Sequence, residues 1–376
     1  MAGKYHRKCV TIAPGQRKTV YAKTKAELKE KIKALQAEID GGYIVPSNKV
    51  KISDVADQWL PFHAKKTGIA ESTQLSYATT IRRHIVPMFR KLPIQNLTEF
   101  AIITKMDGKQ DLSSSTRRKI LITLRLVVKF AKRQGIISKD PMEHIPLPRQ
   151  VNVTDRDMHC MNNEQSRGFL TAIGGMRFQN LFTILLSTGM REGELFALSV
   201  RHIIDDYRFV QIRRTLSDDV NGCPQIRPQP KTSASRRTIP LPEIARAAVL
   251  SEMALRMREG RQGHDLLFST AGGTHHRRQN VIRRHFRPAT KKAGLTDAMT
   301  IHDLRHTYAT LALNAGIGVH LISKMLGHAS VSITIDLYGH ALPDATAAAA
   351  GLVDDVLSGR EPAETALTAV SAVKVR

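Results

Sequence analysis

Apolar residues recur at helical spacing along most of this chain of 376 residues, and the elements they predict form three groups. The first group has short strands around residues 10–12 and 19–22 and then a helix over residues 25–39. That helix carries an apolar face, which favours a packed module over a solvated basic tail. We therefore predict a small α+β module over residues 1–45.

The second group is helical throughout. Apolar residues such as Trp59, Ile81 and Leu124 belong to runs at helical spacing, which predict a small all-α bundle over residues 50–140. Three prolines follow within eight residues, from Pro141 to Pro148. Because proline interrupts a helix, we expect an extended linker over residues 141–161.

The third group mixes helices and strands and is expected to fold as one unit over residues 162–345. Helices are predicted over residues 162–173 and 180–187, and strands over residues 209–215 and 237–241. The rest of this group is mostly helical. The chain as a whole is therefore expected to be multidomain and mainly α, with small antiparallel β-sheets, and we see no internal repeat.

An Ala-rich tail over residues 346–376 follows the third group. After His340 it holds three basic against five acidic residues. Because the tail is slightly acidic, we expect it to pack on a partner subunit or on its own domain.

The chain is strongly basic, which indicates a polyanionic partner. Lys and Arg number 57 against 33 Asp and Glu, giving a formal net charge of +24 and a pI near 10.2. Nucleic acid and an anionic membrane surface both fit this charge, but no apolar run approaches the roughly 18 residues of a spanning helix. No signal-peptide pattern opens the sequence, so we expect a cytoplasmic protein acting on DNA, with no membrane.

Basic residues are concentrated in the first segment of the chain and near several predicted helix starts. The first 37 residues hold ten Lys or Arg against two Glu. The serines at 113–115 predict a helix start that could hold phosphates, although an ordinary helix cap is the simpler interpretation for any one of them. The candidate DNA-binding residues are Lys18, Lys23, Arg82, Arg83, Arg117, Arg118, Arg236, Arg277 and Arg283.

Common signatures of nucleotide and metal chemistry are missing from the sequence. It contains no GxxxxGK[ST], HExxH or CxxC pattern, so we predict neither a cofactor nor a metal site. Cys9, Cys160 and Cys223 are odd in number and widely spaced, and we interpret them as free thiols. Cutting DNA would then need a nucleophile, cations for the phosphate oxygens and an acid for the leaving oxygen, all from ordinary side chains.

Four segments offer such side chains in order along the chain. STGMREGEL places Arg191 after a glycine turn, with Glu194 three residues later on the same helical face, where it could orient the guanidinium. HDLRH places His302 and Arg305 together at the start of a helix. Two further motifs follow along the chain. LGH contains His328, and DLYGH contains Tyr338.

These boxes, STGMREGEL, HDLRHTYAT, LGH and the tyrosine of DLYGH, resemble those of the tyrosine site-specific recombinases of the phage integrase type. The resemblance covers about residues 162–342. It implies a catalytic recombinase domain, preceded by a helical SAM-like domain that binds the core site and a small module that binds arm-type sites. It also implies a C-shaped clamp on DNA.

The resemblance assigns roles to individual residues. Arg191 and Arg305 would hold the scissile phosphate, His302 would be a general acid/base and His328 a hydrogen-bond donor to the phosphate. Tyr338 would be the nucleophile that forms a 3′-phosphotyrosyl bond. PKTSASRRTIPL fits the hairpin that carries the family's catalytic lysine, so Lys231 would be the acid for the leaving group.

Other residues near these boxes have lesser expected roles. Glu194 is a candidate support for Arg191. His306 and His340 adjoin two of the boxes without matching catalytic positions, and we interpret them as packing or orienting residues.

Three rival functions are weaker. A type IB topoisomerase would share the chemistry without exchanging partners, and a metal-dependent relaxase would need a His-x-His cluster for which His275 and His276 are a poor substitute. A purely architectural DNA-binding protein would leave the ordered catalytic set unexplained. By resemblance we expect a homotetramer on two DNA duplexes at attachment sites, with a host DNA-bending protein and an excision factor as possible partners.

Overall fold

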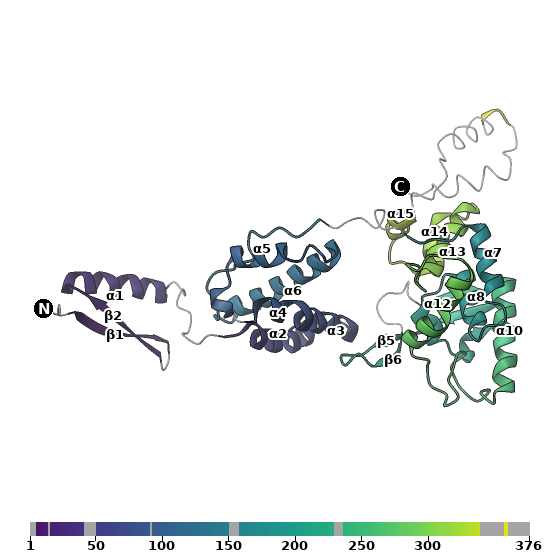
Figure 1. Cartoon of the computed structure of the whole chain (residues 1–376), viewed down its shortest axis with the longest axis horizontal. Helices are drawn as coiled ribbons and strands as arrows, with labels where there is room; N and C mark the ends of the chain where they lie inside the picture. Colours follow the sequence, from purple (N-terminus) through teal and green to yellow (C-terminus); the bar gives the residue numbers. More distant parts are fainter. Residues whose placement is uncertain are drawn as a thin grey trace. The chain divides into compact units, whose positions relative to one another are not determined.

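The computed structural model of this chain divides into two compact units, one formed by residues 1–151 with 220–222 and the other by residues 152–219 and 223–376 (Figure 1). The structure describes residues 5–13, 16–40, 50–90, 92–149, 158–228, 236–338 and 357–359. Within these residues, no helix combines the length and the apolar character that crossing a membrane requires.

The N-terminal module is a hairpin covered by one helix. Strands β1 (His6–Ala13) and β2 (Gln16–Ala22) pair antiparallel, and α1 (Lys25–Asp40) packs against both of them (Figure 1). Ala22 and Leu35 are buried. The predicted order of two strands and a helix is confirmed.

A helical bundle follows, as the sequence predicts. Its helices are α2 (Ile52–Thr67), α3 (Glu71–Thr80), α4 (Val86–Phe89), α5 (Glu99–Asp107) and α6 (Ser114–Arg133). Val55, Trp59, Ile85 and Leu124 are among its fully or almost fully buried residues. Residues 141–149 then run without regular structure, as the prolines there predict.

Two π-helical turns share a short local sequence. Ile81–Ile85 and Ile282–Phe286 both begin Ile-Arg-Arg-His, and a proline follows two residues after each. In each turn the residue after it donates its backbone N–H five residues back, from Val86 to Ile81 and from Arg287 to Ile282. Because proline cannot donate in a helix and collides with the preceding turn, the wider π turn admits it with little disruption.

The second unit is mainly helical. Its helices are α7 (Asn163–Ala172), α8 (Gln179–Thr188), α9 (Glu192–Phe196), α10 (Glu243–Arg258), α11 (Arg278–Val281), α12 (Arg287–Lys292), α13 (Asp303–Asn314), α14 (Val319–Leu326) and α15 (Val331–Tyr338). Helix α8 packs against both α10 and α13, and it is buried on most of its surface. Such a helix must be apolar nearly all round, which explains its sequence Leu-Phe-Thr-Ile-Leu-Leu.

Two small antiparallel sheets complete the second unit. Strands β3 (Ile203–Ile204), β4 (Phe209–Ile212) and β7 (Arg237–Pro240) form one sheet in that order, and β5 (Arg214–Asp218) pairs with β6 (Pro224–Pro228) in the other.

The single strand expected over residues 209–215 is therefore wrong. The segment contains two strands, because Ile212 pairs with Arg237 while Arg214 pairs with Pro228 in another sheet. The apolar pattern marks extended chain but does not show where a strand changes partner.

Gly189 ends α8 at a point where three helices come close together. Its φ of +64° lies in the left-handed region, which favours glycine. A Cβ placed there would overlap Cδ1 of Tyr308 on α13 and would lie 2.9 Å from Cδ2 of Leu326 on α14. This glycine therefore allows α8 to approach both helices.

We predict that Gly189→Ala lowers the free energy of unfolding of the second unit by about 2 to 4 kcal/mol, from overpacking plus left-handed strain. Gly294→Ala is the matched control, because its φ of +68° is similar but nothing lies within 4 Å of a Cβ there; it should cost about 1 kcal/mol. Far-UV circular dichroism during denaturation measures both. Fluorescence of Trp59, the one tryptophan of the chain, reports the first unit and should not change.

Candidate active site

The end of α14 is where Arg191, Arg305 and His328 meet. Gly327 adopts φ +69° and ends the helix, and His328 donates its backbone N–H to the Ser323 carbonyl while Gly327 donates to that of Lys324. This turn satisfies two of the terminal carbonyls. The carbonyls of the next three residues, 325–327, still need donors.

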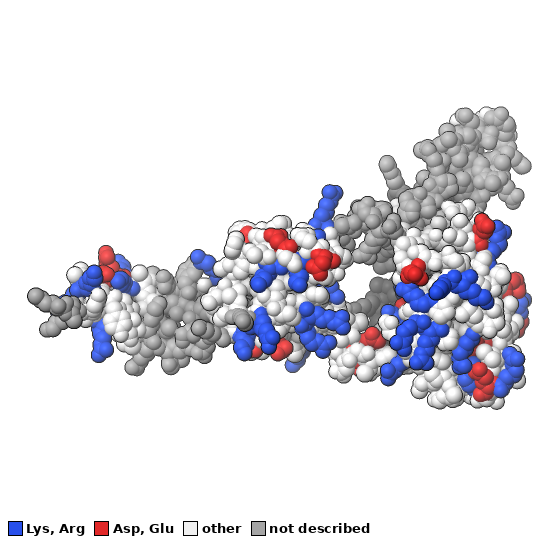
Figure 2. Space-filling view, viewed as in Figure 1, with Lys and Arg blue, Asp and Glu red and all other residues white. Residues whose placement is uncertain are grey.

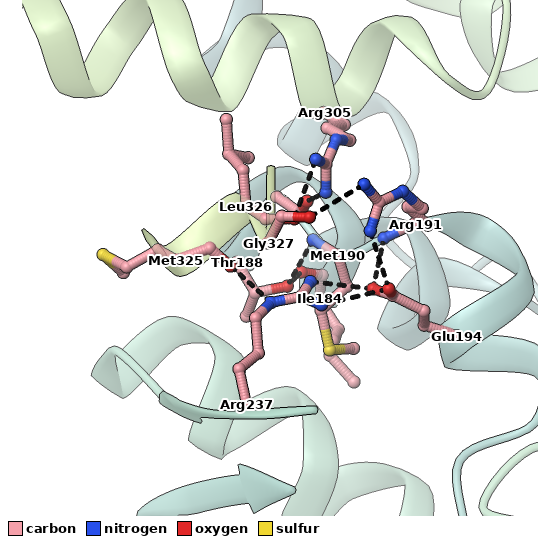
Figure 3. Close-up of polar contacts among 11 residues, drawn as sticks. Ile184, Thr188, Met190, Arg191, Glu194, Arg237, Arg305, Met325, Leu326 and Gly327 are labelled. Atoms are coloured by element: carbon pink, nitrogen blue, oxygen red, sulfur yellow. Dashed lines mark hydrogen bonds and ion pairs between the residues drawn. The ribbon is translucent and has the colours of Figure 1, made fainter. Parts of the chain in front are cut away.

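Three arginines supply those donors (Figure 3). Arg237 Nε donates to the Met325 carbonyl at 2.6 Å, Arg305 to the Leu326 carbonyl at 2.8 Å and Arg191 to the Gly327 carbonyl at 3.2 Å. The arginines come from β7, α13 and the start of α9, so one helix end joins three elements. The positive guanidinium groups also suit the negative end of the helix dipole.

Glu194 links two of these arginines. Its buried carboxylate accepts from Arg191 at 3.0 Å and from both terminal nitrogens of Arg237, at 3.0 and 2.8 Å. The Arg191 backbone N–H also donates to it at 3.0 Å. Burial by itself would raise the pKa of Glu194, but the hydrogen bonds and charge of Arg237, together with Arg191, lower it. The expected contact between Glu194 and Arg191 is therefore present.

Arg305 is the most deeply placed of the predicted phosphate-binding residues. It is 3% exposed and also donates to the Gly189 carbonyl at 2.7 Å. Burial and the positive charge of Arg191 lower the pKa of Arg305 to about 9, so it still carries its charge at neutral pH. Among Arg191, Arg237, Arg305 and Glu194 there are three cations and one anion, which leaves a net positive site that suits a phosphate.

His328 follows the same helix end directly. Its Nδ1 lies 2.8 Å from the hydroxyl of Thr334, which is fully buried on α15. Burial, followed by the charges of Arg305 and Arg191, lowers the pKa of His328 to about 3. A neutral ring that accepts the Thr334 hydroxyl at Nδ1 carries its proton on Nε2, where it is able to donate a hydrogen bond.

His302 and His306 lie one helical turn apart at the start of α13. Their ring centroids are 4.9 Å apart in an edge arrangement. His302 is exposed as a residue, but its ring is partly shielded from solvent by neighbouring protein atoms. This loss of solvation lowers the pKa of His302, and the nearby His306 and Arg305 lower it further. Burial likewise lowers the pKa of His306. Both rings are therefore neutral at neutral pH.

Tyr338 ends α15 and is 1% exposed. It packs in a cluster with apolar residues of α13 and α14, including Leu313 and Leu326. Its hydroxyl lies 2.7 Å from Nδ1 of His306. Burial raises the pKa of Tyr338, and the nearby Arg305 opposes this shift. The structure thus brings Tyr338 near Arg305, with His306 rather than His302 at its oxygen.

The basic residues predicted to bind DNA have varied surroundings. Lys231 and the side chain of Lys18 lie outside the described residues. Arg117 donates to Gln110 and Ser114, and Arg118 donates to the Pro148 carbonyl. The Ser113 side chain caps α6 by accepting from the Thr116 N–H. This is the ordinary helix cap that the sequence favoured as the simpler interpretation. The exposed candidates are Lys23, Arg82, Arg83, Arg236, Arg277 and Arg283.

Lys and Arg side chains also gather on the face of the second unit seen in Figure 2. In the described part of the chain, no three His, Cys, Asp or Glu side chains are grouped so as to hold a metal ion. Cys9, Cys160 and Cys223 form no disulfide.

Two residues of this site were missed or set aside by the sequence reasoning. Arg237 is 6% exposed at its side chain and bridges Glu194 to α14, but in SRRTIPL only its neighbour Arg236 was considered. For His306, directly after Arg305, the sequence predicts only a packing or orienting role, whereas the structure places its ring at the Tyr338 hydroxyl. In both cases the tertiary contact, not the local pattern, identifies the residue.

Comparisons with known proteins agree with this arrangement. A family profile described as "Phage integrase family" matches residues 158–344, and one described as "Phage integrase, N-terminal SAM-like domain" matches residues 51–119. A "Tyrosine recombinase XerC-like" protein of Caldanaerobacter subterraneus is 25% identical over 90% of this chain and 93% of its own length. The ICEBs1 integrase of Bacillus subtilis is 25% identical over 74% of this chain and 76% of its own length.

Solved structures show the same fold. The Tn1549 transposon integrase in complex with a circular intermediate DNA matches with a TM-score of 0.64 and 20% identity, covering 81% of this chain and 99% of that one. A lambda integrase tetramer bound to a Holliday junction matches with a TM-score of 0.57 and 16% identity, covering 87% and 91%.

We predict that Glu194→Gln destabilises the second unit by about 3 to 5 kcal/mol at neutral pH, because it leaves two arginines without their carboxylate. Since the folded pKa lies below the ordinary value of 4.5, the stabilisation by Glu194 is present above that pH and is lost as pH falls through the folded pKa. The difference between the two proteins should therefore shrink in acid.

Denaturation at several pH values measures this difference. Glu243→Gln is the control, because that side chain is 89% exposed and pairs with Arg246 at 3.7 Å; it should change stability by about 0.5 kcal/mol or less. A difference between Glu194→Gln and the parent that stays constant down to pH 3 would contradict the assigned role of the carboxylate.

Proposed function

The chain belongs to the phage integrase family of tyrosine site-specific recombinases, and we propose that it cuts and rejoins DNA with Tyr338 as its nucleophile. The enzyme is thus a DNA breaking-rejoining recombinase. The observation that carries the assignment of its site is the convergence of Arg191 and Arg305, far apart in sequence, on the adjacent carbonyls of Gly327 and Leu326. Tyr338 packs against that same helix end.

Arg191 and Arg305 would bind the scissile phosphate. Each guanidinium has five N–H donors, so it is able to keep its contacts to the protein and still donate to non-bridging oxygens. The site's excess positive charge is fixed in place before DNA arrives, and it would stabilise the additional negative charge of the pentavalent phosphorane. His328 would add one more hydrogen bond from Nε2.

The cleavage step would exchange one phosphoester for another. The Tyr338 oxygen would attack phosphorus and form a 3′-phosphotyrosyl bond, while the bond from phosphorus to the 5′-oxygen breaks. Lys231 would protonate that leaving oxygen, and His302 would act as a general acid/base. Because the phosphotyrosyl bond keeps the energy of the broken linkage, rejoining to a new 5′-hydroxyl needs no ATP.

The rest of the chain would hold the DNA. Residues 1–45 would bind arm-type sites and the bundle of residues 50–140 would bind the core site beside the catalytic domain of residues 162–345. Exposed Arg82, Arg83, Arg277 and Arg283 are proposed contacts to the DNA backbone, which positions the protein without reading sequence. We expect the protein to work on DNA in a bacterial cytoplasm, with a host DNA-bending protein and an excision factor as possible partners.

We propose that the working assembly is a homotetramer on two duplexes, with the tail of residues 346–376 packed on a neighbouring subunit. The lambda integrase relative forms a tetramer on a Holliday junction, which supports this assembly. The mass of the protein bound to a synthetic four-way junction carrying its site, measured by light scattering, should equal four chains per junction. A plateau at one or two chains would contradict the tetramer.

The covalent step is tested with a nicked suicide duplex carrying candidate attachment DNA from the source genome. With EDTA and no ATP, the parent should form a protein–DNA adduct that persists on a denaturing gel, and Tyr338→Phe should form none. Tyr338→Phe keeps the aromatic ring and should bind the DNA as the parent does in a shift assay. Normal binding by this variant would show that its missing adduct is not caused by a loss of DNA binding.

An adduct that Tyr338→Phe still forms would show that another residue is the nucleophile. If the parent binds the duplex without forming an adduct, an architectural function gains support. With two intact partner duplexes, products with exchanged flanks identify recombination, whereas a type IB topoisomerase would only reseal its substrate.

A further inference from the structure

The hydroxyl of Tyr338 has a hydrogen-bonding partner, His306, to which the family resemblance assigns no catalytic role. The hydroxyl lies 2.7 Å from His306 Nδ1, and the two ring centroids are 5.6 Å apart. Tyr338 is 1% exposed, so among the described residues His306 takes the place that water would otherwise have at the hydroxyl. The buried oxygen therefore depends on this imidazole for its hydrogen bond.

We propose that His306 accepts the proton of Tyr338 as the tyrosine oxygen attacks phosphorus. This inference rests on the proposed role of Tyr338 as nucleophile. It assigns to His306 a catalytic function in place of the packing or orienting role expected from the sequence.

The direction of the hydrogen bond follows from the two groups. Burial raises the pKa of Tyr338, so the phenol keeps its proton until reaction. Burial lowers the pKa of His306, with Arg305 adding to this shift and Asp303 opposing it, so the ring is neutral. The phenol then donates to Nδ1, and the proton of the neutral imidazole is on Nε2.

His302 is less well placed for this step. His302 is exposed, and its ring meets that of His306 in an edge arrangement with centroids 4.9 Å apart. Since a base must be within hydrogen-bond reach of the proton that it takes, the geometry favours His306. His302 stays available for a role at the phosphate or at the leaving oxygen.

The proton count of the step is balanced. The bond from the Tyr338 oxygen to phosphorus forms, the phenolic proton moves to His306 Nδ1, and the bond from phosphorus to the 5′-oxygen breaks as that oxygen takes a proton from Lys231. In rejoining, the incoming 5′-hydroxyl returns its proton to Lys231. The imidazolium of His306 then protonates the departing tyrosine, which restores the starting state.

Two substitutions separate proton acceptance from hydrogen bonding. In His306→Asn, the amide reaches the position of Nδ1 and is able to accept the Tyr338 hydroxyl, but it cannot hold a proton at neutral pH. His306→Ala removes both functions and leaves space for added imidazole. The assay is the single-turnover rate of adduct formation on the suicide duplex, with DNA binding and circular dichroism checked for each variant.

We expect both variants to bind the duplex normally and to form adduct at least about 100-fold more slowly than the parent, the usual size of a general-base effect. Imidazole should restore part of the rate to His306→Ala and none to Tyr338→Phe. If His306→Asn cleaves within about threefold of the parent, the proposal is overturned, and this holds even if His306→Ala fails to fold. A parent without an adduct would instead overturn the role of Tyr338.

The pH profile gives an independent reading. The groups facing His306 are His302, Asp303 and Arg305 at the start of α13, Tyr338 from α15 and His328 after α14, and both His306 variants keep them. Cys160, before α7, acts on Tyr338 and is also unchanged. The parent's rate should fall in acid, as the imidazole takes up a proton from solvent. In His306→Asn hydroxide must remove the phenolic proton, so the rate should rise about tenfold per pH unit above neutrality. A profile identical to that of the parent would overturn the proposal.

A substrate with sulfur in place of the 5′-bridging oxygen separates the two ends of the reaction. A thiolate leaves without a proton, so Lys231→Ala should recover most of its rate on this substrate. His306→Asn should stay slow, because the tyrosine still has to lose its proton. Recovery of His306→Asn would place His306 at the leaving group and would overturn the proposal.

Discussion

The arrangement of the catalytic domain depends on how the C-terminus of α14 is satisfied. The glycine turn at Gly327 provides backbone donors for the Ser323 and Lys324 carbonyls, and three arginines from three other elements donate to the next three carbonyls. Buried carbonyls without partners are costly, so the helix end can only be placed where all three arginines reach it. The same contacts fix the guanidinium groups that the phosphate would need.

This arrangement holds more positive charge than it neutralises. Glu194 pairs with Arg191 and Arg237 but leaves the charge of Arg305 without a matching anion in that group. Burying such charge is unfavourable, and the helix dipole offsets only part of the cost. A phosphodiester that enters between Arg191 and Arg305 would neutralise one of the two unbalanced charges, so part of the cost of the DNA-free site would become binding energy for the proposed scissile phosphate.

Tyr338, the proposed nucleophile, lies in an apolar pocket instead of among charged groups. Tyr338 is buried among apolar side chains, which raises its pKa and keeps it protonated, and its hydroxyl is paired with a neutral histidine. A buried phenol is a poor nucleophile until a base takes its proton, so the pocket combines protection from unwanted reaction with a built-in acceptor. Because Leu326 belongs both to this pocket and to the arginine-bound helix end, the two parts of the site share one wall.

The sequence by itself determined the mainly helical fold through its periodicity, and its motifs gave the order of Arg191, His302, Arg305, His328 and Tyr338, because periodicity and motifs are local properties of the chain. The roles of these residues and the division into module, bundle and catalytic unit stay predictions. The contact of Glu194 with Arg191 was also accessible, since three residues of helix bring them together. Only the tertiary structure decided that β4 and β5 belong to different sheets, that Arg237 joins Glu194 to α14, and that His306 rather than His302 meets Tyr338. Those facts depend on contacts between segments distant in sequence, which the packing of α8, α13 and α14 around Gly189 brings together.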